Sequence, residues 1–594
     1  MTVDPFARTA ATDGRAVVRW TRVASAWSVA YLLWRAAFTL DGADGPAAAV
    51  LFLAEVLAVV VFVARARSAS GEPIGVVVSP DAPMPDIAAV VDATGSSVHE
   101  LRTTLVALRR VAGVDRVLIV DRAGSRRLPS VAERFGATVV DPSIGFDQAV
   151  LSAAAGWVLL LRSGDLPMPD LISVVAPCCS SRDVAVIQVG LEEADPTSFE
   201  HDPDAHWSLE PFEQQVVRPA FAGRGSIPWY GDGPAVVRRS ALVGLDSVGD
   251  GHMLDDSRRV GLELIRRGLA VTLVPLTLAR VRGPYGLGES LVRRHARASR
   301  ALRALRPRDL RDIPPAARAA QLDALLPTVA AVQRLLLVVA AVLVLGTAQV
   351  PLRASFTGLV VLAVPSYLLR WTAHRHIGRG RLGALSILRS DLRSLGVDLA
   401  PFGRLGGGAN RAGLGALVAT IVVLDLAVVL GAVALWRESS NRLPVTVAVV
   451  AFALTVGFVA IATEVLLDAV GRRQRRADRR VRLGLVSCRI GEIDGQLVDL
   501  STGGAGIVVP ATGEDELDVG DVTTVAFRIP DADGAWRNVA ALVRIAHRRE
   551  DLDGGVHLGL AFDDPTDAPL DPVVEFLTVD RRLVALGRHE SASR

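Results

Sequence analysis

The chain has 594 residues, half of them apolar, and its mean hydropathy of +0.36 is high for a soluble protein. All 65 basic residues are arginine and the net charge is only +2, so an isolated arginine carries little information and we expect no nucleic-acid partner. The cysteines Cys178, Cys179 and Cys488 are too few and too badly spaced for a disulfide framework or a zinc site. These properties predict a multidomain protein with membrane-spanning segments.

Six apolar stretches are candidates for transmembrane helices. Crossing a bilayer takes about 20 mostly apolar residues. The stretches form three pairs, within residues 23–66, 329–369 and 414–467, and the first stretch contains Arg35. We expect six transmembrane helices, with Arg35 facing the inside of the helical bundle because a charge is costly in lipid.

Arginine-rich segments predict the orientation in the membrane. They occupy residues 1–22, follow the second stretch at 65–67, fill the loop 370–411 and follow the sixth stretch at 472–480. Basic residues favour the cytoplasmic side, and an even number of spans places all four segments there. We expect a multi-pass protein of the inner (cytoplasmic) membrane with both termini in the cytoplasm. Residues 382–396 have the pattern of an amphipathic helix at the membrane surface.

Residues 74–326 have the pattern of a soluble α/β domain. Helical patterns, such as those at 98–111 and 128–135, alternate with short β-like runs. These runs lie at residues 87–93, 116–121, 137–141, 157–162 and 184–190. The alternation predicts a parallel sheet with crossover helices, in which ligands bind at the carboxyl ends of the strands.

Charged residues follow several of these strands. Asp121 begins the sequence DRAGS, Asp165 follows RSG, and the pair Asp255-Asp256 and Arg294 come later. Acids commonly end strands in α/β folds, and the acidic pair also fits a helix N-cap. These structural interpretations stay open beside a catalytic one.

Several segments of this domain resemble the glycosyltransferase family 2 domain of bacterial cellulose synthases. The segment ending in DRAGS resembles the one with a DDGS-type motif, and LLLRSGDLPMPDLI resembles the strand and turn with the DxD motif. HMLDDSRRVGLELIRRGLAVTLVP resembles the segment with the catalytic acidic pair, and SLVRRHARASR stands where such synthases carry Q-x-x-R-W. The order of spans and domains is also similar. The resemblance implies a glycosyltransferase-A-like fold.

The resemblance also implies roles for particular residues. Asp121, Asp165 and Arg294 would bind a nucleotide sugar, and Asp255 and Asp256 would be the catalytic carboxylates, with Asp256 as the base. Transfer of this kind also needs a divalent cation to neutralise the leaving diphosphate. Mg or Mn is therefore expected only if the transferase is active.

The motifs depart from the family pattern at the positions that matter most for chemistry. Arg122 stands where a second acid is expected, and RSG at residues 162–164 replaces the metal-binding DxD motif. In the later Q-x-x-R-W motif, Leu291 and His295 replace the glutamine and the tryptophan. An arginine in a metal site repels the cation, so we predict a degenerate transferase with no metal site. Two alternatives stay open: the arginine of RSG pairs directly with a diphosphate, or Asp165 acts in a shifted register.

From residue 479 the pattern is all-β. Six β-like runs precede a closing helix at 570–586; the runs lie at 481–490, 495–500, 505–510, 522–529, 538–547 and 555–562. This pattern predicts a small antiparallel barrel within a domain of residues 471–586.

Two polar motifs accompany the barrel. RRADRR at 475–480 precedes its first strand, and DLSTGG at 499–504 ends its second. Arginine forks bond phosphate oxygens and the guanine Hoogsteen edge bidentately. Asp499 and Ser501 offer short polar arms, and Gly504 allows a close backbone approach. The pair predicts a site for a doubly phosphorylated purine dinucleotide, although the arginines alone also fit a juxtamembrane stretch that contacts anionic lipid.

The two motifs resemble the RxxxR and D/NxSxxG motifs of the PilZ domain. The resemblance implies cyclic di-GMP as a regulatory ligand, bound by Arg475, Arg476, Arg479, Arg480, Asp499, Ser501 and Gly504. Two registers satisfy RxxxR, and we favour Arg476 with Arg480 over Arg475 with Arg479 because Arg480 directly precedes the strand.

Two functions fit these expectations. The first is a cyclic-di-GMP receptor in the lipid bilayer, whose degenerate transferase domain reports to a polysaccharide synthase or envelope complex in cell-envelope or exopolysaccharide control. The alternative is an active processive glycosyltransferase, a nucleotide-sugar-dependent polysaccharide synthase gated by cyclic di-GMP. The spans contain few polar residues to line a polymer channel, which favours the receptor.

Overall fold

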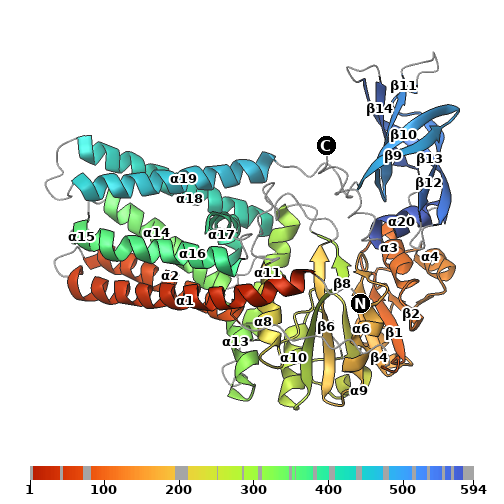
Figure 1. The fold of residues 1–594 in the computed structure, drawn as a ribbon, viewed down its shortest axis with the longest axis horizontal. Helices are drawn as coiled ribbons and strands as arrows, with labels where there is room; N and C mark the ends of the chain where they lie inside the picture. The colour runs from red at the N-terminus through yellow and green to blue at the C-terminus, as the bar shows by residue number, and fades with distance from the viewer. Residues whose placement is uncertain are drawn as a thin grey trace.

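The computed structural model shows a helical layer, an α/β domain and a barrel (Figure 1). The arginine cluster RRADRR lies outside the described residues. The structure describes residues 5–579 except 41–44, 71–81, 127, 194–211, 250–251, 284–286, 305–310, 347–348, 350, 353, 355, 379–383, 400–408, 437–444, 472–480, 511–516, 531–534, 551–554 and 564–567.

Long helices pack side by side at one end of the molecule (Figure 1). Helix α1 packs against α16, α2 against α14, and α18 against α19. Three short segments lie between α14 and α16 in the chain: η2 (Val342–Gly346), α15 (Phe356–Gly358) and η3 (Leu359–Ala363). The long helices are α1 (Pro5–Phe38), α2 (Gly45–Ala69), α14 (Leu326–Ala341), α16 (Val364–Ile377), α18 (Ala409–Trp436) and α19 (Val445–Gly471).

Two helices in the described part of the chain are long and apolar enough to cross a membrane, Gly45–Ala69 and Leu326–Leu345. The described apolar runs within α18 and α19 are shorter, at Val418–Val429 and Phe452–Leu467. Helix α16 has only 14 residues. The prediction of six transmembrane helices therefore stays a proposal.

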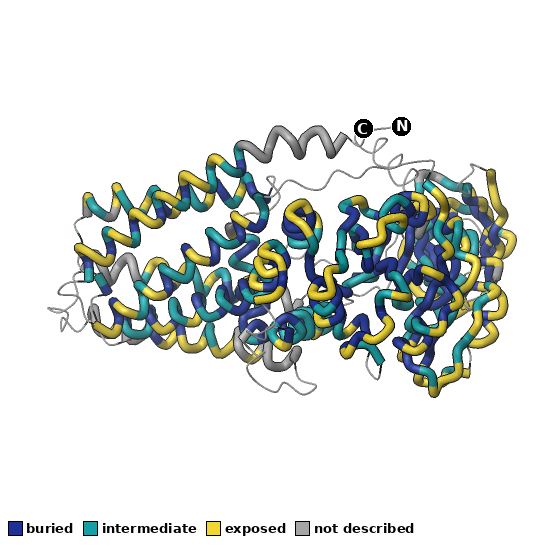
Figure 2. The backbone as a smooth tube through the Cα atoms, turned by 90° about the horizontal axis from the view of Figure 1, so that it is seen from below, coloured by how far each residue is buried: buried dark blue, intermediate teal, exposed yellow. Residues whose placement is uncertain are grey.

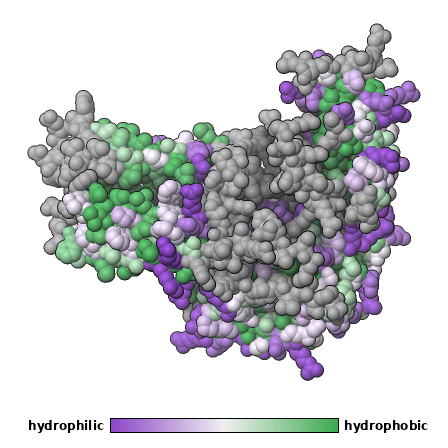
Figure 3. All heavy atoms as spheres, viewed as in Figure 1, coloured by the Kyte–Doolittle hydropathy of each residue, from purple (hydrophilic) through white to green (hydrophobic). Residues whose placement is uncertain are grey.

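The helical layer exposes large apolar side chains. Leu33 and Phe38 on α1 are 66% and 72% exposed, and Leu454 on α19 is 70% exposed. Exposed positions run along the outer sides of the helices (Figure 2), and hydrophobic side chains gather over this end of the visible face (Figure 3). Contiguous apolar surface of this kind marks a membrane or protein contact rather than a surface facing water.

The one arginine in the middle of the first apolar stretch is buried between helices. The side chain of Arg35 is 0% exposed, and its Nε lies 2.9 Å from Glu55 Oε2 on α2. Tyr31 donates a 2.8 Å hydrogen bond to the same carboxylate. Arg35 thus faces the inside of the layer, as expected from the cost of a charge in lipid.

The α/β domain contains one mixed sheet with strand order β3-β2-β1-β4-β7-β6-β8-β5. The first four strands run parallel, but β7 runs antiparallel to both β4 and β6. The α/β prediction is confirmed, and the expectation of a wholly parallel sheet is wrong, because the four-residue β7 is too short to detect in the sequence pattern. The strands are β1 (Ile87–Asp92), β2 (Val114–Val120), β3 (Thr138–Val139), β4 (Trp157–Arg162), β5 (Leu166–Pro167), β6 (Val184–Glu193), β7 (Ala235–Arg238) and β8 (Ala270–Val281).

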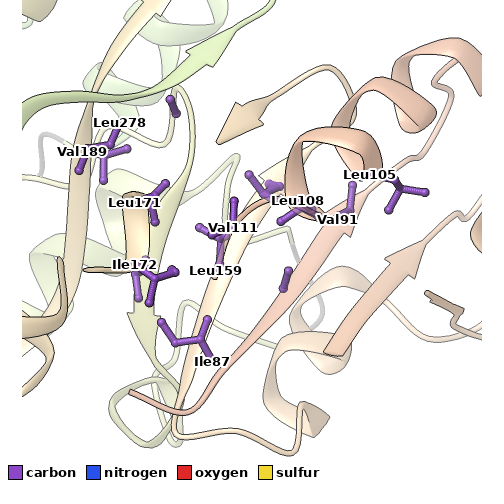
Figure 4. Close-up of a cluster of buried hydrophobic side chains, with 14 of the residues drawn as sticks. Ile87, Val91, Leu105, Leu108, Val111, Leu159, Leu171, Ile172, Val189 and Leu278 are labelled. Atoms are coloured by element: carbon purple, nitrogen blue, oxygen red, sulfur yellow. The ribbon is translucent and has the colours of Figure 1, made fainter. Parts of the chain in front are cut away.

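Alternate residues of the central strands fill two cores. On β1, Val91 points to the face covered by α3 (Val98–Leu108) and α6 (Leu171–Cys179), whereas Val90 belongs to the opposite core. Figure 4 shows Val91, Leu105 and Leu159 in the first core. The remaining helices are α4 (Leu128–Arg134), α5 (Phe146–Ser152), η1 (Glu213–Val217), α8 (Arg218–Ala222), α9 (Arg239–Leu242), α10 (Ser257–Arg266), α11 (Leu287–Arg303) and α13 (Pro315–Asp323).

The amphipathic segment of the loop forms helix α17 (Ala384–Leu399), which packs against α14 and α18. Its acidic residues are buried: Asp391 lies 3.1 Å from Arg334, and Asp398 lies 2.7 Å from Arg294 of α11. Helix α17 therefore connects the helical layer to the α/β domain through ion pairs.

The C-terminal strands form the predicted antiparallel barrel, closed in the order β10-β11-β14-β13-β12-β9. Its interior is lined by alternating apolar residues such as Val525, Phe527 and Ile529. Helix α20 (Asp571–Val579) covers this core through Val573, and residues 580–586 of the predicted closing helix lie outside the described residues. The strands are β9 (Val481–Ile490), β10 (Ile493–Ser501), β11 (Gly504–Pro510), β12 (Val522–Pro530), β13 (Trp536–Glu550) and β14 (Gly555–Phe562); η5 (Ala568–Leu570) precedes α20.

Candidate functional site

The DLSTGG sequence forms the tight turn between β10 and β11. Ser501 is buried, and its Oγ donates a 3.0 Å hydrogen bond to the carbonyl oxygen of Gly504, which closes the turn. A shift in pairing register between Leu497 and Asp499 bends β10 just before the turn. The serine of the motif therefore holds the backbone in shape.

Two glycines of β11 are needed for steric reasons. A Cβ on Gly504 would lie 2.0 Å from the carbonyl oxygen of Leu560 on β14, so only glycine fits. A Cβ on Gly506 would lie 2.5 Å from Asp499 Oδ1, so the aspartate side chain lies over this glycine. Sequence analysis missed Gly506; its position opposite Asp499 in the strand pairing is what makes it important.

The arginines Arg475, Arg476, Arg479 and Arg480 lie outside the described residues, so their geometry is not described. The strand that follows them is described. β9 begins at Val481, which pairs with Leu500, and the next residue pairs with Asp499. The start of the barrel therefore lies beside the DLSTGG turn.

In the α/β domain, Asp121 stabilises its own loop. This buried carboxylate accepts backbone hydrogen bonds from Ala123 (3.0 Å) and Ser125 (2.7 Å). The neighbouring Arg122 lies against Gly145, where a Cβ would be 2.6 Å from its Nη2. Both oxygens of Asp121 are thus engaged in the turn after β2.

Arg162 forms an ion pair with the candidate catalytic acid. Its Nη2 lies 3.0 Å from Asp255 Oδ1, and its Nη1 donates to the carbonyl oxygen of Gly231 at 3.3 Å. The guanidinium therefore places a positive charge beside Asp255, at the turn where the family pattern has its metal-binding acids.

A divalent cation does not fit these residues. Among the described residues no three His, Cys, Asp or Glu side chains gather in a group that could hold a metal. A second cation beside Asp255 would meet the charge of Arg162, and at close range two like charges repel strongly. The ion pair with Arg162 therefore makes a divalent cation beside Asp255 unfavourable.

Asp165 is buried at the same turn. Its Oδ2 accepts a 2.7 Å hydrogen bond from the backbone N–H of Arg162. Burial raises the pKa of Asp165 to about 7, although the hydrogen bond and the charge of Arg162 act in the opposite direction. Near neutral pH this buried carboxyl therefore keeps its proton more readily than an ordinary carboxyl does, which suits a structural role better than cation binding.

We expect Asp165→Asn to stabilise the protein more at pH 8 than at pH 5. In the folded state Asp165 keeps its proton until about pH 7, whereas the unfolded chain loses it near the ordinary value of 3.8, so stability falls as pH rises between these values. Asparagine has no such cost and keeps an oxygen for the Arg162 N–H. The advantage of the variant grows by about 2–3 kcal/mol between pH 5 and pH 8, measured by thermal unfolding. The exposed Asp170→Asn is the matched control; an equal response in both variants would contradict the interpretation.

Asp256 occupies the N-cap position of α10, but its side chain makes no capping hydrogen bond. The backbone N–H groups of Asp255 and Asp256 both donate to the carbonyl oxygen of His252, at 2.8 and 3.1 Å. The structure therefore brings the acidic pair to the carboxyl edge of the sheet. The Asp256 carboxylate does not cap the backbone N–H groups of α10.

Sequence analysis missed Asp92 and His252. Asp92 ends β1, and its Oδ2 lies 2.9 Å from His252 Nε2, whose ring stacks on Phe146 at 4.6 Å. Burial acts to raise the pKa of Asp92, but the hydrogen bond and charge of His252 lower it overall. The rule that selected Asp121, an acid ending a buried strand, applies equally to Asp92 and could have found it.

Arg294 lies apart from these residues. It forms a two-pronged ion pair with Asp398 of α17, with Nε–Oδ1 at 2.8 Å and Nη2–Oδ2 at 2.7 Å. It lines a cavity of about 80 Å³ together with Arg218, Tyr230 and Arg258. The centroid of the Tyr230 ring lies 4.0 Å from Cζ of Arg218 and 4.9 Å from Cζ of Arg258. In the described structure Arg294 therefore links α11 to α17 through its ion pair with Asp398.

Residues 472–578 match the family model of the PilZ domain, so the C-terminal resemblance is confirmed and this part of the chain is a PilZ domain. No curated protein matches the chain. Among solved structures, a mannosyltransferase from Pyrobaculum calidifontis, in complex with GDP-Man and Mn²⁺, is 16% identical, with 58% of this chain and 99% of that chain covered and a TM-score of 0.40. Glucosyl-3-phosphoglycerate synthase from Mycobacterium tuberculosis is also 16% identical; the match covers 37% of this chain and 80% of that chain, with a TM-score of 0.27. Scores this low do not establish a shared activity.

Proposed function

We propose that the protein is an integral membrane receptor for cyclic di-GMP whose glycosyltransferase-like domain has lost metal-dependent transfer. The PilZ domain receives the signal, and the α/β domain transmits it to a polysaccharide synthase or envelope complex. The observation that carries the loss of transfer is the ion pair between Arg162 and Asp255, because it neutralises a candidate catalytic acid with a built-in cation.

Messenger binding is supported by the PilZ match and by the geometry of the turn. Asp499 and Ser501 lie where β9 begins, directly after the arginine cluster in the chain. We propose that Arg476 and Arg480 bind the phosphates and guanine edges, with Arg475 and Arg479 as the other register. Gly504 keeps β11 close to β14 and so positions the turn.

The membrane proposal rests on the helical layer. Its apolar exposed side chains and two long apolar helices favour a bilayer around it (Figure 3). With the arginine-rich segments on one side, both termini and both polar regions lie in the cytoplasm, where a cytosolic messenger reaches the barrel. The proposed domain division is 74–326 for the transferase-like part and 471–586 for the PilZ part.

A second candidate function is an active, messenger-gated glycosyltransferase. It is favoured by one observation: Asp255 and the uncapped Asp256 lie at the carboxyl edge of the sheet, beside the pair of Asp92 and His252. Activity of this kind would require Arg162 to leave Asp255 or to bind the diphosphate itself.

We expect the purified protein in detergent to release no nucleoside diphosphate above a protein-free blank. The substrates are UDP-glucose, UDP-N-acetylglucosamine and GDP-mannose, with Mg²⁺ or Mn²⁺ and with or without cyclic di-GMP. The reason is that Arg162 occupies the position a cation needs. Metal-dependent turnover that Asp256→Asn abolishes would establish the second candidate, and messenger binding in the same preparation shows that the protein is folded.

A further inference from the structure

We propose that helix α3 couples the messenger-binding turn of the barrel to the Arg162–Asp165 turn of the transferase-like site. The proposal rests on the proposed function and names how the signal crosses between the two domains. Three stripes of α3 contact three different parts of the molecule. Leu101, Leu105 and Leu108 pack into the core of the sheet, and the other two stripes reach the barrel and the 162–165 turn.

The first of these stripes binds the barrel through buried charges. Arg102 is completely buried, and its Nε and Nη2 donate to Asp571 Oδ1 at 2.8 and 2.6 Å. Asp571 is the first residue of α20, and Arg110, just beyond α3, pairs with Glu575 of the same helix. A buried charge is costly without its partner, so these pairs hold α20 and α3 in one relative position.

The same stripe touches the messenger motif itself. His99 Nε2 and Thr502 Oγ1 share a hydrogen bond of 3.2 Å. Thr502 lies inside Asp-x-Ser-x-x-Gly, one residue after Ser501. A ligand that binds this turn therefore binds next to the contact between Thr502 and His99 of α3.

The neighbouring stripe holds the transferase-like site. Thr104 Oγ1 accepts a 2.8 Å hydrogen bond from the backbone N–H of Gly164, in the turn that aims Arg162 and Asp165. Glu100 forms an ion pair with Arg282. Arg282 in turn packs close to Gly164, because a Cβ added to this glycine would lie 3.5 Å from the Cβ of Arg282. Gly164 has a φ of +93°, a left-handed conformation that glycine adopts readily and other residues do not.

The two contacts lie close together on one rigid element. His99 and Thr104 are five residues apart, a rise of about 7.5 Å along a helix. A capping box between Ser97 and Glu100 fixes the start of α3. A shift of the helix at one contact is therefore felt at the other, and a ligand at either site must change the affinity of the other by the same factor.

Hydrogen exchange of the full-length protein in detergent tests the proposal, because the Gly164 N–H that bonds Thr104 is itself the exchanging group. We expect cyclic di-GMP to slow exchange in residues 499–506 and to change the exchange rate of residues 98–108 and of Gly164 by about fivefold or more. Fragmentation to single residues reads Gly164 directly.

Two matched threonine variants distinguish coupling through the Thr104–Gly164 hydrogen bond from a general decrease in the mobility of the protein when the messenger binds. Thr104→Val removes the acceptor for Gly164 and keeps the shape, so the messenger effect should persist in 98–108 and disappear at Gly164. Thr103→Val is the control, since the Thr103 hydroxyl donates a 2.7 Å hydrogen bond to the carbonyl oxygen of His99 within α3 itself, and it should respond as the wild type.

The outcomes distinguish the two proposals. Protection of 499–506 with no change in 98–108 or at Gly164 would overturn the coupling through α3 and leave the receptor function intact. Equal responses of Thr104→Val and wild type at Gly164 would also overturn it. No protection of 499–506 and no binding of cyclic di-GMP would overturn the receptor function, and the coupling with it.

Discussion

Replacing Arg476 and Arg480 together with alanine is expected to weaken the binding of cyclic di-GMP to the full-length protein by at least about 30-fold, as measured by calorimetry. Two bidentate arginine contacts contribute about 1–3 kcal/mol each. Their joint loss therefore costs about 2–6 kcal/mol, and each 1.4 kcal/mol is about tenfold in affinity. Micromolar binding would become at least about 30-fold weaker.

Two double variants serve as controls for this result. Arg475→Ala with Arg479→Ala tests the other register, and the pair with the larger loss identifies the binding arginines. Arg528→Ala with Arg549→Ala removes the same charge from exposed positions on β12 and β13 and should leave affinity almost unchanged. Undiminished binding by both cluster variants would refute the assignment of the messenger site.

The second large effect is expected from Gly504→Ala. The added Cβ would lie 2.0 Å from the carbonyl oxygen of Leu560, a backbone atom that can move only if β11 and β14 separate. We expect the variant to lower the free energy of unfolding of residues 471–586 by about 3 kcal/mol or more. Urea unfolding followed by far-UV circular dichroism measures it.

Gly555→Ala is the matched control, because it adds the same group to the partner strand. Its Cβ would lie 3.3 Å from Val508 Cγ1 and 3.9 Å from the nearest backbone oxygen. We expect a change within about 1 kcal/mol in either direction. Similar losses in both variants would mean that Gly504 has no special steric role in the barrel.

The β-pattern of the C-terminal region was readable because apolar and polar residues alternate along strands such as β12 and β14. Val525, Phe527 and Ile529 point inward and the residues between them do not, so each run predicted its strand closely. The mixed sheet was not readable in the same way. β7 is a four-residue buried strand, and nothing in a run that short indicates its direction.

The helical layer illustrates a different limit. Apolar length alone predicted the helices, and two of them, Gly45–Ala69 and Leu326–Leu345, meet the length and hydropathy that a span requires. The helix α17 was predicted from its amphipathic pattern, yet its acids proved to be buried against Arg334 and Arg294. A periodic pattern shows that a helix has two faces and does not show what covers each face.

The candidate site also contains contacts that the sequence predicts and contacts that it does not. The turn at DLSTGG was determined by the sequence itself, because Ser501 bonds a backbone atom only three residues away. The ion pair of Arg162 and Asp255 joins residues 93 positions apart, and the contact of His99 and Thr502 joins residues 403 positions apart. Local chemistry acts over a few residues and can be read along the chain. Contacts of such separation depend on how sheet, barrel and helices pack, so only the tertiary structure decided them.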